Sequence, residues 1–155
     1  MTWNAMSARR AYELIEFWIA TPWPLTRPEV QERAAQLGWV VERNALMNRV
    51  DGLTQPAVLT GVLPDGTFGS LGFRVTDVVR DGGARGAEFL DDQFALMVRE
   101  GTDRWGTPRF KRGRAQIAKW QLSDGARVDA RRSNTSVVLE YTTPQQSAEL
   151  HRRGE

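Results

Sequence analysis

Residues 118–141 read AKWQLSDGARVDARRSNTSVVLEY, and they set the fold class of this chain. Apolar and polar side chains alternate in three short runs, which is the pattern of strands with one buried and one exposed face. Asp124-Gly125 predicts a tight hairpin turn of the primed type, and Ser133-Asn134 predicts a second turn. Consecutive hairpins join neighbouring antiparallel strands, so the stretch predicts a three-stranded meander. The predicted inward residues are Ala118, Trp120, Leu122, Ala126, Val128, Ala130, Val137, Leu139 and Tyr141.

Helices are predicted on both sides of this meander. Upstream, a helix is expected from about residue 87 to residue 104, with one buried stripe formed by Leu90, Phe94, Met97 and Val98. Trp105-Gly106-Thr107-Pro108 predicts its end, because Gly favours the left-handed position after a helix and Pro cannot continue one. Residues 80–86, RDGGARG, are expected to form a flexible loop before it. Downstream, Thr143-Pro144 predicts the start of a short terminal helix.

The first half of the chain is expected to add two helices and further strands. Ser7 and Thr26 are the predicted helix caps, and Pro64-Asp65-Gly66-Thr67 predicts a turn between antiparallel strands. The predicted strands are residues 39–43, 45–50, 57–63 and 68–79. No repeat or linker interrupts the chain, so we predict a single α+β domain over residues 1–155. Its antiparallel sheet has about six strands, helices packed on one face, and helices at the N- and C-terminal ends.

The residue types present argue against several chemistries. Without Cys the chain has no disulfide, no thiolate nucleophile and no Cys-based metal site. Its one His, His151, is expected in the last turn of the terminal helix, where a cation interacts favourably with the helix dipole. No His cluster exists for zinc, no catalytic triad can be assembled, and no phosphate-binding glycine motif follows a predicted strand. We therefore predict no catalytic residue, no cofactor and no metal.

The N-terminal segment bears on the expected location of the protein. Its apolar residues are interrupted by Glu13 and Glu16, so it predicts neither a signal peptide nor a membrane span. The absence of Cys fits a reducing compartment. The sequence therefore predicts a cytoplasmic protein with no membrane partner.

Charge is distributed unevenly along the chain. The net charge is +2, but residues 1–103 carry ten basic and fourteen acidic side chains, whereas residues 104–155 carry eleven basic and five acidic ones. The connection predicted after the third helix holds the cations Arg109, Lys111, Arg112 and Arg114. They could form a solvated loop, contact a protein partner or contact nucleic acid. The groove and aromatic spacing of a nucleic-acid reader are missing, so nucleic acid is the least favoured partner.

Four short motifs carry a resemblance to a known family. They are Leu37-Gly38-Trp39, Trp105-Gly106-Thr107-Pro108, Trp120-Gln121-Leu122 with Gly125, and Thr143-Pro144. In this order they resemble a family of small actinobacterial proteins of unknown activity. That family is similar to the immunity proteins of secreted polymorphic toxins, often encoded near type VII secretion genes. The resemblance supplies no catalytic residues.

The resemblance implies a cytoplasmic immunity protein that binds and blocks a cognate toxin, as a monomer or homodimer. Either the cationic segment 109–114 meets an acidic toxin surface, or an acidic group at the start of the third helix imitates a phosphate. This acidic group is Glu88, Asp91 and Asp92. A type VII secretion chaperone or adaptor holding a secreted substrate is the first alternative, with Tyr12 and Phe17 lining an apolar groove. A nucleic-acid-binding module is the second alternative.

Overall fold

A six-stranded antiparallel sheet forms the centre of the computed structural model, which describes residues 2–154. Its strand order is β3-β4-β8-β7-β6-β5, and a separate two-stranded sheet pairs β1 with β2. The strands are β1 (Val40–Glu42), β2 (Ala45–Met47), β3 (Leu59–Val62), β4 (Phe68–Arg74), β5 (Arg109–Arg112), β6 (Gln116–Gln121), β7 (Arg127–Arg132) and β8 (Val137–Thr142). The helices are α1 (Ala8–Ile19), α2 (Arg27–Ala35), α3 (Gly83–Trp105) and α4 (Pro144–Arg152). The predicted α+β fold with N- and C-terminal helices is confirmed.

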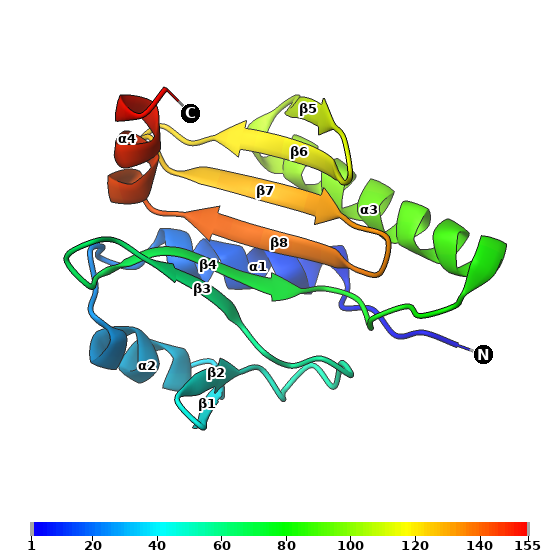
Figure 1. Ribbon diagram of the computed structural model, residues 1–155, viewed down its shortest axis with the longest axis horizontal. Coiled ribbons are helices and arrows are strands. Elements are labelled where there is room, and N and C mark those ends of the chain that lie inside the picture. The colour runs from blue at the N-terminus through cyan, green and yellow to red at the C-terminus, as the bar shows by residue number, and fades with distance from the viewer. Residues whose placement is uncertain (1, 155) are drawn as a thin grey trace.

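The helices leave one face of the sheet uncovered. Figure 1 shows α1 and α3 behind the sheet, where α1 packs against β8 and α3 against β6, β7 and β8. The short helix α4 stands at one end of the strands, and α2 lies with β1 and β2 beyond β3. Antiparallel sheets commonly bury one face and expose the other to solvent, which is the arrangement here.

The core lies between the sheet and the helices α1 and α3. Ala11, Leu14, Ile15 and Trp18 form a buried stripe on α1, and Trp18 contacts Trp23 and Trp39. The predicted inward residues of the meander are buried too, except Leu122, which is half-buried. Trp120 packs edge-on against Tyr12 and donates its indole N–H to the Gly106 carbonyl at 2.9 Å, so the predicted core role of Trp120 is confirmed.

The cationic segment after α3 is a strand rather than the predicted loop. Residues 109–112 form β5, which pairs with β6 and lies at the edge of the sheet. All four residues are exposed. An edge strand exposed on both faces lacks the alternation that marks a half-buried strand, so the periodicity of the sequence did not reveal it.

The third helix begins earlier than predicted, within the glycine-rich segment. It starts at Gly83, so most of the predicted flexible loop 80–86 is helical. Packing explains why position 86 is a glycine, because a Cβ there would lie 2.7 Å from Cγ1 of Val79. Gly82 and Gly86 therefore allow close packing against Val79, and Gly83 provides a positive φ of 59° at the start of the helix. As a consequence Glu88, Asp91 and Asp92 lie beyond the first turn of α3, too far along the helix to interact with its N-terminal dipole.

The turn between β6 and β7 also differs from the predicted primed type. Gly125 has a φ of 90°, but Asp124 does not have a positive φ, whereas a type I′ turn needs two successive positive values. The Leu122 amide donates to the Ala126 carbonyl at 2.8 Å, and the Gly125 amide donates to the Leu122 carbonyl at 3.0 Å. This is a three-residue hairpin loop with glycine in the left-handed position.

Candidate partner-binding face

The register of the sheet places a group of cations on the uncovered face. Gly72, Glu140, Asp129, Lys119 and Arg109 are successive partners across five strands, so their side chains share one face. A neighbouring row runs from Arg74 through Val138, Arg131 and Ile117 to Lys111. Together with Arg127, two residues before Asp129 on β7, these rows define what we call the cationic sheet face. Its members are Arg74, Arg109, Lys111, Lys119, Arg127 and Arg131.

Most of these cations have no acidic partner. Within residues 2–154, Arg131 forms the one ion pair of the cationic sheet face, 4.0 Å from a carboxylate oxygen of Glu140. The remaining members have no described carboxylate within ion-pair distance. Unpaired cations gathered on one face create a positive potential that attracts an acidic surface.

Two carboxyl groups lie at the centre of the cationic sheet face. Asp129 and Glu140 are cross-strand partners, and Asp129 is only 6% exposed. Burial raises the pKa of Asp129 against the opposing effect of the nearby cations Lys119, Arg127 and Arg131. Burial and the Asp129 charge likewise raise the pKa of Glu140. The face is therefore positive around its rim and mixed in charge at its centre.

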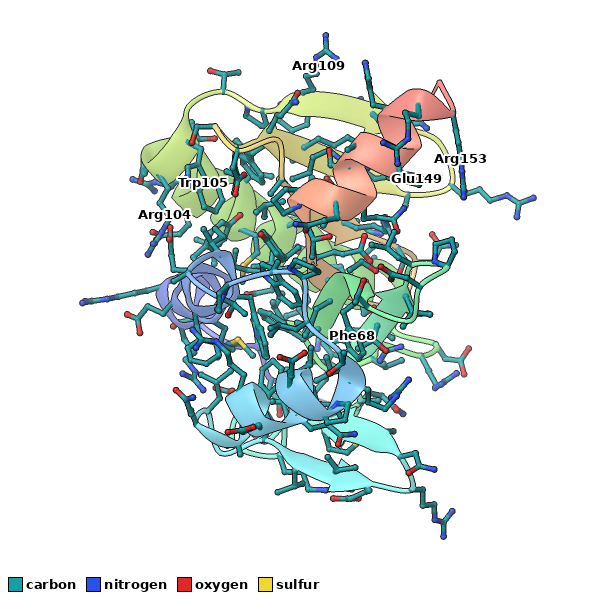
Figure 2. All side chains as sticks on the ribbon, turned by 90° about the vertical axis from the view of Figure 1, so that its left-hand side faces the viewer. Phe68, Arg104, Trp105, Arg109, Glu149 and Arg153 are labelled. Carbon is teal, nitrogen blue, oxygen red and sulfur yellow. The ribbon has the colours of Figure 1, made fainter. Side chains whose placement is uncertain are left out.

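A groove borders this face at the end where α4 stands. It has a volume of about 760 Å³ and lies between α4 and the adjoining ends of β5, β6 and β7. Figure 2 shows this end of the molecule, with Arg109 projecting from one edge and the Glu149 and Arg153 side chains on α4 and just after it. The groove is lined on its sheet side by Arg109, Lys119, Gln121 and Arg127, and on its helix side by Pro144, Ser147, Ala148 and His151. It extends the positive surface into a concave site.

The structure separates the two groups of residues that the sequence offered for partner binding. Arg109 and Lys111 lie on the cationic sheet face, whereas Arg112 is directed to the other side of β5 and Arg114 lies in the exposed turn after it. The acidic group of Glu88, Asp91 and Asp92 is exposed on α3, on the opposite side of the sheet. Arg132 donates to Asp91 at 2.9 Å, so one of the three carboxylates in the acidic group is already paired.

Four members of the cationic sheet face were absent from the sequence-based candidates. They are Arg74, Lys119, Arg127 and Arg131. Alternation along the predicted strands already indicated that these side chains point away from the core. Their assembly with Arg109 and Lys111 depends on the pairing of β4 with β8 and of β5 with β6, which alternation does not specify.

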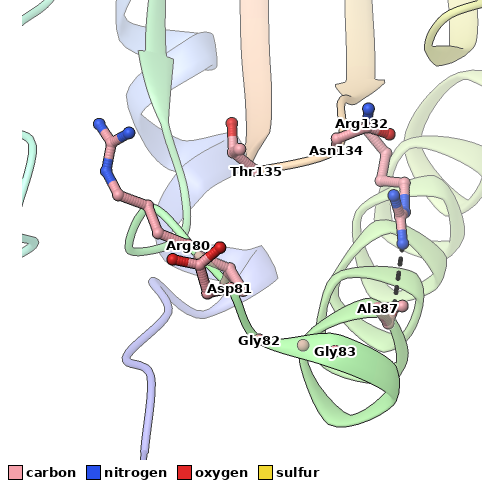
Figure 3. Close-up of a pocket in the computed structure, with 10 residues that line it drawn as sticks. Arg80, Asp81, Gly82, Gly83, Ala87, Arg132, Asn134 and Thr135 are labelled. Atoms are coloured by element: carbon pink, nitrogen blue, oxygen red, sulfur yellow. Dashed lines mark hydrogen bonds between the residues drawn. The ribbon is translucent and has the colours of Figure 1, made fainter.

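A second cavity lies where α3 begins (Figure 3). It has a volume of about 560 Å³ and is bounded by the glycine-rich segment and by the β7–β8 turn. Arg132 donates to the Ala87 carbonyl at 3.0 Å, and Arg80 extends away from it on the other side of the cavity. Because Arg132 is also bonded to Asp91, its charge is satisfied within the protein. This cavity therefore offers fewer free charges than the cationic sheet face.

Residues 2–154 form neither a cluster that could hold a metal ion nor a helix that could span a membrane. No group of three or more His, Cys, Asp or Glu side chains is placed to hold a metal ion in this part of the chain. No helix formed by these residues combines the length and the apolar character needed to cross a membrane.

Comparison with known proteins identifies the family but not an activity. The family model DUF6301, described as a family of unknown function, matches residues 9–143. This match covers most of the 155 residues, so the chain belongs to that family. The comparison with curated proteins gave no match, and neither did the comparison with solved structures.

Proposed function

We propose that this member of the DUF6301 family is an immunity protein, which binds a cognate toxin in the cytoplasm and blocks it without turnover. One observation carries the proposal: an uncovered sheet face presents six cations, and one of them has a carboxylate partner among the described residues. If this face packed against another part of the same chain, its cations would be paired with carboxylates of that chain. Cations without a carboxylate partner favour fast association with an acidic surface of another protein.

The same face favours a protein partner over a nucleic acid. A nucleic-acid reader combines cations with aromatic side chains that stack on bases. The outward residues of β4, β6, β7 and β8 include no aromatic side chain among those described, since Phe73, Trp120 and Tyr141 face the core. Trp105 and Trp120 line the adjoining groove, but both rings pack against Tyr12 in the core. At the centre of the face Asp129 and Glu140 would repel phosphate. A folded protein surface can match such a mixed pattern, with acidic groups opposite the rim.

The core geometry counts against the feature that suggested a secretion chaperone. Tyr12 is fully buried and donates its hydroxyl hydrogen to the Met97 carbonyl at 2.6 Å, so it lines no exposed groove. Phe17 is half-buried, packs against Trp18 and lies beneath the Arg33 guanidinium. The apolar groove expected for an unfolded export substrate is therefore not formed by these two residues.

Co-expression tests the proposed function directly. Each product of the genes adjacent to this one is expressed in a bacterial host, with and without this protein, and growth is followed. We expect one product to stop growth and this protein to restore it. The purified pair should bind one to one, with an affinity that falls as NaCl is raised, because screening weakens attraction between exposed charges.

Charge-reversal variants connect the activity to the face. Lys119→Glu/Arg127→Glu should abolish growth rescue and weaken binding by a factor of about 100 or more, as expected when two cations facing an acidic surface are replaced by like charges that repel it. Arg80→Glu/Arg85→Glu changes the net charge equally on exposed residues outside the face and should keep both properties. If no adjacent gene product is neutralised, or if both double variants behave alike, the proposal is wrong. Tight binding of an RNA oligonucleotide at low salt would favour the nucleic-acid alternative.

A further inference from the structure

β5 is an unprotected edge of the main sheet. Among residues 2–154 it pairs only with β6, on one side, and each of its four residues is exposed. The backbone groups on the outer side of an edge strand have no intramolecular partner and can pair with a strand from another chain.

The hydrogen-bond pattern identifies which backbone groups face outward. Leu122 donates to Ala126, so the even-numbered residues of β6 bond to β7 and its odd-numbered residues, Ile117 and Lys119, bond to β5. Their partners Lys111 and Arg109 therefore use their N–H and C=O groups inside the sheet. The N–H of Gly113 donates to the Ala115 carbonyl, which agrees with the odd-numbered residues of β5 bonding inside the sheet. Phe110 and Arg112 consequently direct their N–H and C=O groups away from the sheet.

An apolar groove lies beside this free edge. The Phe110 side chain is 58% exposed on the side of the sheet that α3 covers. It borders a groove of about 350 Å³, whose apolar lining includes Phe94, Ala95 and Val98 of α3. A residue placed opposite Phe110 on an added strand would point to the same face and enter this groove.

The charges around the edge select the occupant. Arg109, Lys111 and Arg112 in the strand have no carboxylate within 4.0 Å among residues 2–154, and Arg99 lines the groove. Pairing of β5 with β5 of a second copy would set these cations against one another, which is unfavourable across strands. A strand with carboxylates opposite Arg109 and Lys111, and an apolar side chain opposite Phe110, complements these three residues.

We propose that β5 binds an extended acidic segment of a partner protein, which pairs along its free edge as a seventh strand. The segment alternates acidic and apolar residues, and one apolar side chain lies in the groove beside Phe110. That this partner is the toxin rests on the proposed function; the pairing itself rests on the free edge of β5, its cations and the apolar groove beside it. Main-chain hydrogen bonds supply affinity in this mode, and the alternating side chains supply specificity.

Amide hydrogen exchange of the full chain tests the pairing without knowledge of the partner. In the free protein, we expect rapid exchange at Phe110 and Arg112 and slower exchange at Arg109 and Lys111. The peptide used is a capped octapeptide of alternating Glu and Val. At ten times its Kd it should slow exchange at Phe110 and Arg112 about tenfold, because exchange then occurs only from the free fraction. A peptide with four Glu followed by four Val, and an alternating Lys–Val peptide, should have no such effect.

Two substitutions at one position separate the backbone from the side chain. Arg112→Ala removes one charge and should weaken binding of the alternating peptide only a few-fold. Arg112→Pro also removes an outward N–H, while the bonds between β5 and β6 remain, since Pro is tolerated on an edge strand. It should weaken binding at least tenfold more than Arg112→Ala does. The exchange rates at Arg109 and Lys111 report whether β5 stays folded in both variants.

The results that overturn this inference differ from those that overturn the proposed function. Equal binding by Arg112→Pro and Arg112→Ala, or peptide protection confined to β3 at the opposite edge of the sheet, would show that β5 is not the docking strand. Protection of Phe110 and Arg112 that depends on protein concentration, without peptide, would show self-pairing instead. If the peptide binds β5 but no adjacent gene product is neutralised, strand addition stands and the immunity function fails. If a toxin is neutralised equally by both variants, the immunity function stands and strand addition at β5 fails.

Discussion

At the scale of single residues, Gly101 shows how closely the core is packed around α3. It lies on the buried side of the helix, facing the aromatic side chains of Tyr12 and Trp120. A Cβ at this position would lie 2.4 Å from Cζ2 of Trp120 and 2.8 Å from the Tyr12 hydroxyl oxygen. From propensity alone glycine weakens a helix, but here its missing side chain makes room for two rings. Gly101 is thus a packing residue.

Replacing Gly101 with alanine tests this role. Alanine improves helix propensity by about 1 kcal/mol, but overpacking a dense core costs about 1–3 kcal/mol, and both neighbouring rings are buried. We therefore expect Gly101→Ala to lower the free energy of unfolding, measured by urea denaturation. Gly113→Ala is the control, because a Cβ there meets no atom within 4 Å and its φ is not positive. A variant Gly101→Ala as stable as the control variant would contradict the packing role.

At the scale of elements, β5 combines a free edge with a high positive charge. Natural proteins place Lys and similar charges on edge strands to prevent pairing between copies. Three of the four residues of β5 are Arg or Lys, and the fourth is the exposed Phe110. The charge thus restrains self-association of a strand that would otherwise present free backbone groups next to an aromatic ring.

Neutralising this strand should increase self-association. Arg109→Gln/Lys111→Gln/Arg112→Gln removes the repulsion between the edges of two paired copies. We expect the association constant for dimerisation to rise roughly tenfold. Sedimentation equilibrium measures the change. Arg43→Gln/Arg80→Gln/Arg85→Gln removes the same net charge from exposed sites elsewhere and should leave the constant near that of the wild type. Equal increases in both variants would assign the effect to net charge, against a role for the edge.

At the scale of the whole molecule, the sheet register couples stability to pH. It sets Asp129 beside Glu140 on neighbouring strands, and burial raises the pKa of both carboxyl groups. The folded state therefore binds protons more tightly than the unfolded chain at these sites. This contribution to stability is fully present below the ordinary pKa values, 3.8 for Asp and 4.5 for Glu, and is lost as pH rises through the folded values.

The variant Asp129→Asn/Glu140→Gln has no carboxyl groups at these sites, so it should not lose stability there as pH rises. We expect the free energy of unfolding of the wild type, minus that of the variant, to fall as pH is raised from about 4 to about 7. Urea denaturation at several pH values gives the difference. For Asp65→Asn, the free energy of unfolding of the wild type minus that of the variant should instead rise with pH. The reason is that hydrogen bonds from the Thr67 hydroxyl and amide lower the pKa of Asp65. A flat or rising difference for the double variant would show that the pair is not destabilised by ionisation.

The local order of the chain could be read from the sequence. Alternation in residues 118–141 predicted β6, β7 and β8 and their buried side, and Thr143-Pro144 predicted the start of α4. Glycine at residue 106 predicted the end of α3, where its φ is 87°. These signals are local, because caps, turns and side-chain periods depend on residues within a few positions of one another.

The candidate site depended on contacts between distant segments. The pairing of β4 with β8 and the edge position of β5 decide which outward side chains share a face, and no short motif encodes that choice. The sequence by itself determined a half-buried antiparallel sheet, the identity of its inward residues and a surplus of cations after residue 103. Only the tertiary structure decided that Arg74 joins Arg131 and Lys111, and that the acidic residues of α3 lie on the other side of the sheet. The reason is that strand order is set by which pairing buries the shared core, a property of the folded chain as a whole.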